Sequence, residues 1–189
     1  ADPIIVHPDV RRMLMDQKCF VEAARCFALW TALQGDLEEK SDDAATREKA
    51  GDYMALLTPI VKSYLTGKGY DMVSNGLQVH GGSGFTEEWR ASQLLRDARI
   101  TMIYEGTNEI QAIDFLMRKV LGDEGKRLDD FLTLVRADIE DGTLLGEQAR
   151  LLANAVDKLS GLATDIATAA LQSPSLPYYV ADEMLRLTG

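Results

Sequence analysis

Large apolar side chains recur every three or four residues along most of this 189-residue chain. This spacing places them on one face of an α-helix, whereas a β-strand needs strict alternation, of which the sequence contains no useful length. Two of the clearest stripes are Tyr53, Leu56, Leu57, Ile60, Val61 and Tyr64 and, further on, Leu152, Val156, Leu159, Leu162 and Ile166. We therefore predict an all-α protein, an antiparallel helical bundle of about six or seven helices.

Proline, glycine and charge mark the first helix and the segment that follows it. The helix is expected to begin at Pro8 or Asp9, because its first turn does not need the N–H that proline lacks. Gly35 is expected to end it. Residues 36–50 carry six acidic and three basic side chains, so a solvated connection is expected there.

A second helix is predicted over about residues 44–80, with Asp42 or Asp43 as its N-cap. Pro59 is expected to kink this helix or to lie in its first turn. The adjacent glycines Gly81 and Gly82 must end it.

The rest of the chain is predicted to be helical as well. A short helix is expected over residues 87–99, with an apolar side formed by Leu94, Leu95 and Ala98. Residues 103–106 should form a turn, and a capped helix should follow over residues 107–121. Two amphipathic helices and a short last helix near residues 180–187 are then expected to pack beside the bundle or form a subunit contact.

Composition excludes several classes of function. The net charge of −10 and the pI of about 4.7 argue against nucleic acid and anionic membrane surfaces as partners. No apolar run reaches the ~18 residues of a membrane span. The N-terminal residues do not have the pattern of a signal peptide, and without an initiator Met they indicate an excised piece of a longer protein.

The two cysteines, Cys19 and Cys26, are seven residues apart on one helix. This spacing separates them by about 10 Å, too far for a disulfide. They are interpreted as buried thiols in a reducing compartment, the cytoplasm. His7 and His80 have no partners at metal-ligand spacing, so no metal site is expected.

Two constellations between residues 78 and 99 have both structural and functional interpretations. The pair Gly81 and Gly82 is a common helix cap, but glycines also let a phosphate approach the backbone, and Gln78 adds a hydrogen-bonding side chain. Arg96 and Arg99 flank Asp97, which is expected to bond either arginine on a half-exposed helix face.

Glu105 is the candidate for chemistry. Gly106 follows it and permits a tight turn, and Ile103 and Tyr104 precede it. If these two side chains exclude water, the carboxylate is suited to act as a general base near neutral pH. An ordinary surface turn is the alternative interpretation of the same residues.

Three segments occur in order within 34 residues: QVHGGSGFTEE, LLRDARIT and IYEGTNEIQ. Together they resemble the C-terminal helical domain of the acyl-CoA dehydrogenase family. The resemblance implies an FAD-dependent enzyme that removes the α-proton and the β-hydride of an acyl-CoA to give a trans-2-enoyl-CoA. It also implies a homodimer or homotetramer and, as electron acceptor, an electron-transferring flavoprotein or a similar protein.

The resemblance assigns a role to each matching residue. Glu105 is implied as the catalytic base, with its backbone N–H helping to polarise the thioester carbonyl. Tyr104 and Gly106 would line the acyl-CoA site. The implied FAD-binding residues, the first three usually serving a neighbouring subunit, are Gln78, Gly81, Gly82, Thr107 and Glu109. Many members have Gln where Glu109 stands, and an acid is less favourable beside a diphosphate.

The resemblance also predicts how the chain is divided. Residues 1–121 would be the C-terminal helical bundle, incomplete at its N-terminal side, and residues 122–189 a C-terminal helical extension. Such an extension is similar to the long bacterial branch that includes methylmercaptopropionyl-CoA dehydrogenase-like proteins. Because the β-domain grips most of the flavin in this family, the isolated chain is expected to be inactive.

Two alternatives remain beside an acyl-CoA dehydrogenase of undetermined chain-length preference. One is a non-catalytic helical interaction module of the same fold. The other is an acyl-CoA oxidase, since oxygen access depends on regions outside these residues.

Overall fold

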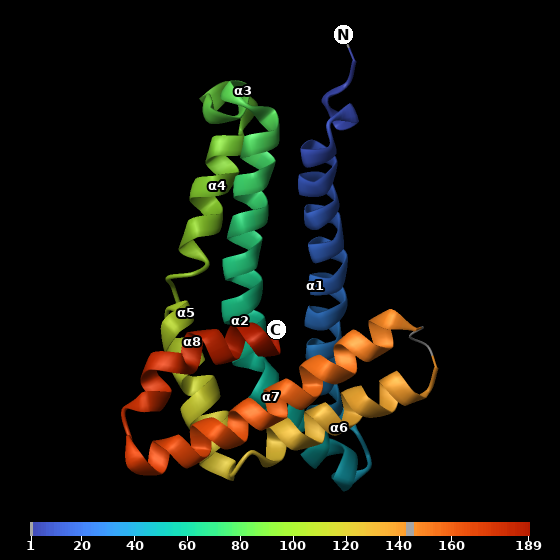
Figure 1. Cartoon of the computed structure of the whole chain (residues 1–189), viewed down its shortest axis with the longest axis vertical. Coiled ribbons are helices and arrows are strands. Elements are labelled where there is room, and N and C mark those ends of the chain that lie inside the picture. Colours follow the sequence, from blue (N-terminus) through green and yellow to red (C-terminus); the bar gives the residue numbers. More distant parts are fainter. Residues whose placement is uncertain (1, 143–145) are drawn as a thin grey trace.

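The computed structural model describes residues 2–142 and 146–189, and over these residues it is helical without any strand (Figure 1). Two long antiparallel helices, α1 (Pro8–Lys40) and α2 (Ala44–His80), form a central helical hairpin. The remaining helices pack along one side and across the lower end of this hairpin. The prediction of an all-α fold is confirmed.

The start of α1 at Pro8 is confirmed, but the predicted end at Gly35 is wrong, since the helix continues to Lys40. Gly35 faces α2, where a Cβ at this position would lie 3.6 Å from the Met54 side chain. Packing against α2 thus offsets the low helix propensity of glycine. The expected connection over residues 36–50 shrinks to the three residues 41–43.

The predicted boundaries of α2 are confirmed. The Asp43 carboxylate accepts hydrogen bonds from the N–H and the hydroxyl of Thr46, at 2.9 and 2.6 Å, and so caps the helix. Pro59 lies inside the helix, which continues on both sides of it. Gly81 ends the helix with φ 62° and ψ −146°, a conformation that a residue with a side chain rarely adopts.

The expected helix over residues 87–99 is interrupted. A short helix α3 (Gly82–Phe85) and a 3₁₀ turn (Glu87–Trp89) precede α4 (Ala91–Ile100), and Arg90 between them has φ 58°. The predicted apolar side is also wrong in part, because Leu94 is 60% exposed while Ala91 and Ser92 are buried. Leu95 and Ala98 of the predicted side are partly buried, so the helix turns a side centred nearer its start toward α2.

The second half of the chain folds back across the hairpin. Helix α5 (Asn108–Ile113) continues into a π-helical segment, η3 (Asp114–Val120), and a 3₁₀ turn, η4 (Leu121–Asp123). Helices α6 (Lys126–Glu140) and α7 (Glu147–Gln172) then lie side by side across its lower end (Figure 1). The last helix, α8 (Leu176–Thr188), packs on α5, η3 and α7.

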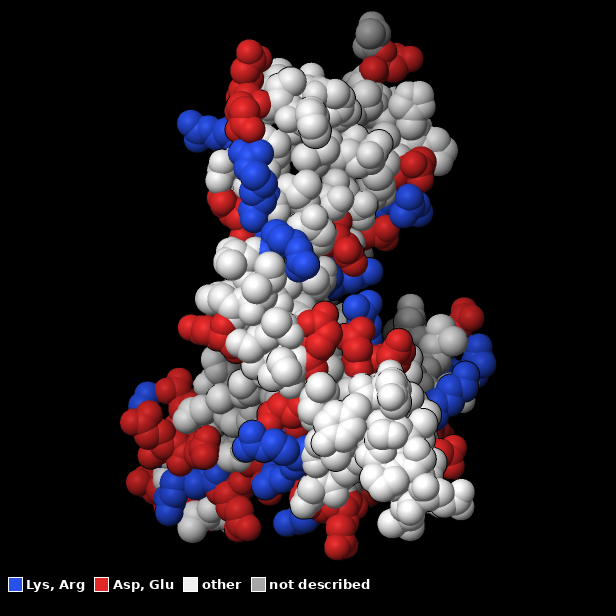
Figure 2. Space-filling view, turned by 90° about the vertical axis from the view of Figure 1, so that its left-hand side faces the viewer, with Lys and Arg blue, Asp and Glu red and all other residues white. Residues whose placement is uncertain are grey.

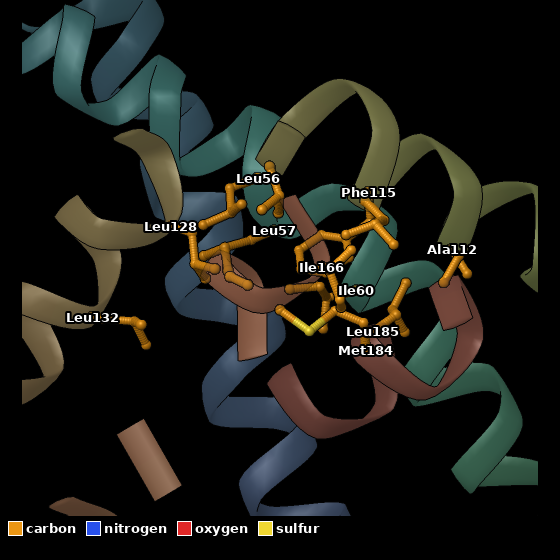
Figure 3. Packing of buried hydrophobic residues seen from close by; sticks show 14 of the residues in the cluster. Leu56, Leu57, Ile60, Ala112, Phe115, Leu128, Leu132, Ile166, Met184 and Leu185 are labelled. Atoms are coloured by element: carbon orange, nitrogen blue, oxygen red, sulfur yellow. The ribbon is translucent and has the colours of Figure 1, made fainter. Parts of the chain in front are cut away.

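One hydrophobic core, termed the shared core, joins the first and second halves of the chain (Figure 3). Its buried residues are Tyr53, Leu56, Leu57, Ile60, Ala112, Phe115, Leu116, Val120, Leu128, Leu132, Val156, Ala163, Ile166, Ala181, Met184 and Leu185. Each large side chain buried there contributes about 1.5–3 kcal/mol. The described helices beyond residue 122 therefore pack on the bundle, as predicted.

The prediction that both cysteines are buried is wrong. Both are free thiols, as predicted, but Cys19 and Cys26 are exposed rather than buried. Helix α1 contacts mainly α2, so the faces that carry these two residues are left uncovered. Over the described residues, no helix combines the length and the apolar character needed to cross a membrane, and no cluster of potential metal ligands occurs.

Candidate active site

The turn between α4 and α5 is closed by backbone hydrogen bonds. The N–H groups of Ile103 and Tyr104 donate to the carbonyl of Ile100 at 2.9 and 3.1 Å. The Asn108 N–H donates to the Met102 carbonyl at 3.1 Å, across the turn. The turn predicted from the glycine at position 106 is therefore present.

Glu105 and Gly106 both have positive φ angles, 53° and 86°. A residue with a side chain in this region costs of order 1–3 kcal/mol and persists only where its surroundings fix it. The Glu105 carbonyl accepts a hydrogen bond from Gln111 Nε2 at 3.3 Å, and a Cβ at Gly106 would lie 3.1 Å from that nitrogen. Backbone strain thus coincides with the candidate base.

The Glu105 N–H is available to an external acceptor. Among the described residues, none accepts a hydrogen bond from it, and the same holds for the N–H groups of Gly106 and Thr107 that follow it. The Glu105 side chain is exposed, and Ile103 and Tyr104 are 47% and 50% exposed. The expectation that these two side chains screen Glu105 from water is therefore not met within this chain.

Thr107 and Glu109 begin α5. The Thr107 hydroxyl accepts a hydrogen bond from the Ile110 N–H at 3.4 Å, so Thr107 is the N-cap of the expected helix, for which the sequence left the capping residue open. The pKa of Glu109 is lowered, first by hydrogen bonds from its own N–H and the Thr107 hydroxyl and then by the charges of Arg99 and Lys62. Glu109 is therefore an anion at neutral pH.

Two residues beside the turn were not predicted as site residues. Asn108 is buried, and its Oδ1 accepts a hydrogen bond from Lys62 Nζ at 2.8 Å. Burial lowers the pKa of Lys62, while the nearby charges of Glu109 and Glu105 act to raise it. Lys62 lies in the middle of α2, where helical spacing alone gives no sign that it faces a turn 43 residues later.

A cavity of about 240 Å³ lies behind this turn, between α2, α5 and α8. Its lining includes Ser63 and Lys68 of α2, Asn108 and Glu109 of α5, and Arg186 of α8. The last helix therefore contributes to the surroundings of the candidate site.

The glycine group lies at the other end of α4. Gly81 and Gly82 are exposed, and a Cβ at either would meet no atom within 4 Å, so the backbone there is open to approach. Gln78, one turn earlier on α2, is also exposed. The ten residues of α4 span about 15 Å, so the chain does not bring this group together with Glu105.

Gly84 was not singled out in the sequence, yet it has the tightest surroundings of this segment. A Cβ at this position would lie 2.7 Å from the Leu77 carbonyl oxygen and from the His80 Cβ. Glycine at position 84 thus lets α3 fold back onto the end of α2.

The arginines of α4 are arranged differently from the prediction. Arg96 donates to Glu87 at 2.9 Å and to Gln93, whereas Asp97 accepts from the Gln93 amide at 2.7 Å. The expected bond from Asp97 to an arginine is therefore wrong. Arg99 lies over the ring of Tyr70, 5.9 Å from its centroid.

Comparison with known proteins shows the family of this chain. The profile of the acyl-CoA dehydrogenase C-terminal domain matches residues 1–121. The whole chain is 39% identical to a 3-methylmercaptopropionyl-CoA dehydrogenase of Ruegeria pomeroyi and covers 33% of it.

Two other relatives match a smaller part of the chain. A broad-specificity linear acyl-CoA dehydrogenase of Mycobacterium tuberculosis is 36% identical over 83% of the chain, and a butyryl-CoA dehydrogenase of Syntrophomonas wolfei is 37% identical over 68%. The matched regions are 26% and 21% of these relatives, so the chain spans between a fifth and a third of the three. The chain belongs to the acyl-CoA dehydrogenase family.

Proposed function

We propose that this chain carries the catalytic base of an FAD-dependent acyl-CoA dehydrogenase, which converts an acyl-CoA thioester to its trans-2-enoyl-CoA. The observation that supports the proposal is the strained turn at Glu105 and Gly106, which presents a carboxylate and an unbonded backbone N–H side by side. The relatives are named for different acyl groups, so no chain length is proposed.

Glu105 accepts the α-proton of the thioester in this proposal. Its free N–H polarises the thioester carbonyl and so stabilises the negative charge that develops as the proton leaves. Tyr104 and Gly106 line the same site, and the glycine allows the thioester to approach the backbone. The exposed side chains of Ile103 and Tyr104 need a covering from other parts of the enzyme to exclude water.

The residues at the end of α2 fit the nucleotide part of FAD. The open backbone at Gly81 and Gly82 lets a diphosphate approach, and Gln78 offers a donor and an acceptor. When bound, FAD supplies the acceptor for the β-hydride. The glycines lie far from Glu105, and the family resemblance implies that they serve the flavin of a neighbouring subunit.

The two residues at the start of α5, Thr107 and Glu109, differ in how well they suit the FAD site. The Thr107 hydroxyl is a neutral hydrogen-bonding group, which suits a position near the cofactor. Glu109 is an anion held by its own N–H and by Thr107, so it disfavours close contact with a diphosphate. We therefore expect Glu109 to act mainly on the helix start and Thr107 to be the nearer residue.

The exposed carboxylate is also compatible with the two alternatives named above, an acyl-CoA oxidase or a helical module without catalysis. The test is to produce a longer enzyme containing this chain, loaded with FAD, and to measure flavin reduction by acyl-CoA in anaerobic stopped-flow. Glu105→Gln should keep the flavin and slow its reduction by ~10²–10⁴-fold. Asp97→Asn is the control and should reduce at close to the original rate.

Flavin reduction by Glu105→Gln at close to the original rate would remove Glu105 from the proposed role. Rapid reoxidation of the original enzyme by oxygen, without another acceptor, would favour the oxidase.

A further inference from the structure

Asn108 is the most buried polar side chain beside the candidate base, with 6% of its surface exposed. Its Nδ2 donates to the Ser63 carbonyl at 3.0 Å, and its Oδ1 accepts from Lys62 Nζ at 2.8 Å and from Thr66 Oγ1 at 3.1 Å. All three partners lie within five consecutive residues of α2. The side chain therefore fastens the start of α5 to the middle of α2.

The same residue also closes the turn that holds Glu105. Its backbone N–H donates to the Met102 carbonyl, so the segment from Met102 to Asn108 is a loop whose two ends are joined. Within that loop, Glu105 and Gly106 adopt positive φ angles. A strained loop keeps one geometry only if its ends are fixed, and Asn108 provides that fixed end.

Lys62 completes the attachment with a charge. Its ammonium group donates to Asn108 Oδ1, and the carboxylates of Glu105 and Glu109 are close enough to act on it electrostatically. Lys62 is partly buried, so its position is restricted by its surroundings. Lys62 therefore places a positive charge near the turn that carries Glu105.

We infer that Asn108 and Lys62 are positioning residues that hold the Glu105 turn against α2 in the geometry required for removal of the α-proton. This inference rests on the proposed function of Glu105. Neither residue needs to touch the substrate, because each acts through the backbone of the turn or the charge beside it. Misplacement of a reacting group by about 1 Å costs up to ~10²-fold in rate, which is the size of effect expected here.

The experiment uses the FAD-loaded longer enzyme and has two readouts. The first is the rate of deuterium exchange from solvent at the α-carbon of a bound acyl-CoA analogue that cannot lose hydride. The second is the kcat and KM of turnover. Asn108→Ala and Lys62→Met should each slow α-exchange by ~10–100-fold and lower kcat with little change in KM. Lys49→Met is the control, because this exposed lysine lies near the start of the same helix and contacts the Tyr53 ring rather than the turn, and it should leave both rates unchanged.

A third readout uses the 189-residue chain without cofactor. Asn108→Ala should speed backbone amide exchange at residues 103–107 more than at residues 94–99 of α4. If Asn108→Ala does not fold because its site is buried, Lys62→Met tests the same inference with a less buried side chain.

The outcomes separate this inference from the proposal on which it rests. If Glu105→Gln leaves α-exchange intact, the assignment of the base fails. If Glu105→Gln abolishes α-exchange while the folded Asn108→Ala and Lys62→Met variants exchange at the original rate, only the positioning role is overturned. Equal losses in the Lys49→Met control would also overturn it.

Discussion

The two ends of the α1–α2 hairpin differ in how they are packed. The core end, residues 44–60, 112–142 and 146–189, holds the whole shared core. The glycine end, residues 4–26 and 70–100, buries only Met72 and Ala91 among its apolar side chains. Many of its large apolar side chains are more than a third exposed, namely Ile4, Ile5, Val6, Leu14, Met15, Val21, Phe85, Trp89, Leu94 and Ile100.

Figure 2 shows how charge is distributed over one face of the molecule. Residues other than Lys, Arg, Asp and Glu cover much of the upper, glycine end beside a column of charged side chains, and at the lower end charged side chains gather on the left while an uncharged area lies on the right. Exposed apolar surface of this extent marks a face that is covered by something else. The core end contains the shared core, whereas the glycine end leaves many of its large apolar side chains uncovered by this chain. Glu105 lies between the two.

The largest effect is expected from ending the chain after Leu121. This truncation removes half of the shared core, namely Leu128, Leu132, Val156, Ala163, Ile166, Ala181, Met184 and Leu185. We expect the truncated chain to lose cooperative thermal unfolding, measured by circular dichroism. Removing residues 1–7 at the glycine end is the control and should preserve it. A cooperative transition in the truncated chain would contradict the importance of the shared core.

A single substitution in each region gives the next largest effect. Phe115 is fully buried, and Phe115→Ala should lower the free energy of unfolding by about 3–5 kcal/mol. Phe85 is 79% exposed, and Phe85→Ala should change that free energy by about 0.5 kcal/mol or less. Urea unfolding of both variants measures the difference, and similar values would show that the glycine end is also packed.

Within the glycine end, the two adjacent glycines should respond differently. Gly81→Ala must adopt φ 62° with a side chain and should cost about 1–3 kcal/mol of unfolding free energy. Gly82→Ala meets no atom within 4 Å and lies in α3, so it should be near neutral. Chemical denaturation of the two variants provides the comparison, and equal costs would mean that backbone conformation is not what requires Gly81.

The smallest effect concerns the cap of α2 at the core end. Hydrogen bonds from the Thr46 hydroxyl and N–H lower the pKa of Asp43 below its usual 3.8. A lowered folded-state pKa adds stability above the unfolded-state pKa, and this stability is lost as the pH falls through the folded-state value. Asp43→Asn keeps a cap without this titration, so its melting temperature should approach that of the original chain below about pH 3.

The control for this titration is Asp42→Asn, which removes a neighbouring carboxylate that does not cap the helix. Its difference from the original chain should not depend on pH in the same way. A pH-independent difference for Asp43→Asn would show that the capping carboxylate is not the titrating group.

Local sequence signals predicted the helices well where one residue determines the structure. Pro8, Asp43 and Gly81 each set a helix boundary through their own backbone or side chain. Gly35 did not end α1 because Met54 packs beside it. The interruption at Arg90 was not predicted, because nothing in the sequence indicates the positive φ of this residue. Tertiary packing overrides propensity at such positions.

In the candidate site, too, local features were predicted and tertiary contacts were not. The turn at Glu105 and the capped helix start after it are local and were predicted from adjacent residues, although the sequence left open which residue forms the cap. The attachment of Asn108 to Lys62 joins residues 46 positions apart, and no periodicity shows which side chains meet at that distance. The burial of Glu105 was overestimated because its two apolar neighbours point to surface that this chain leaves open.

The shared core has a consequence for how relatives of this chain diverge. The boundary of the matched family profile, at residue 121, falls between helices that pack on each other, since α5 and η3 contact α8. Changes in side-chain volume at Ala112 or Phe115 are therefore expected to be accompanied by changes at Met184 or Leu185. A chimera joined at residue 121 takes the two sides of this contact from different parents, so exchanging residues 184 and 185 for those of the first parent should raise its melting temperature.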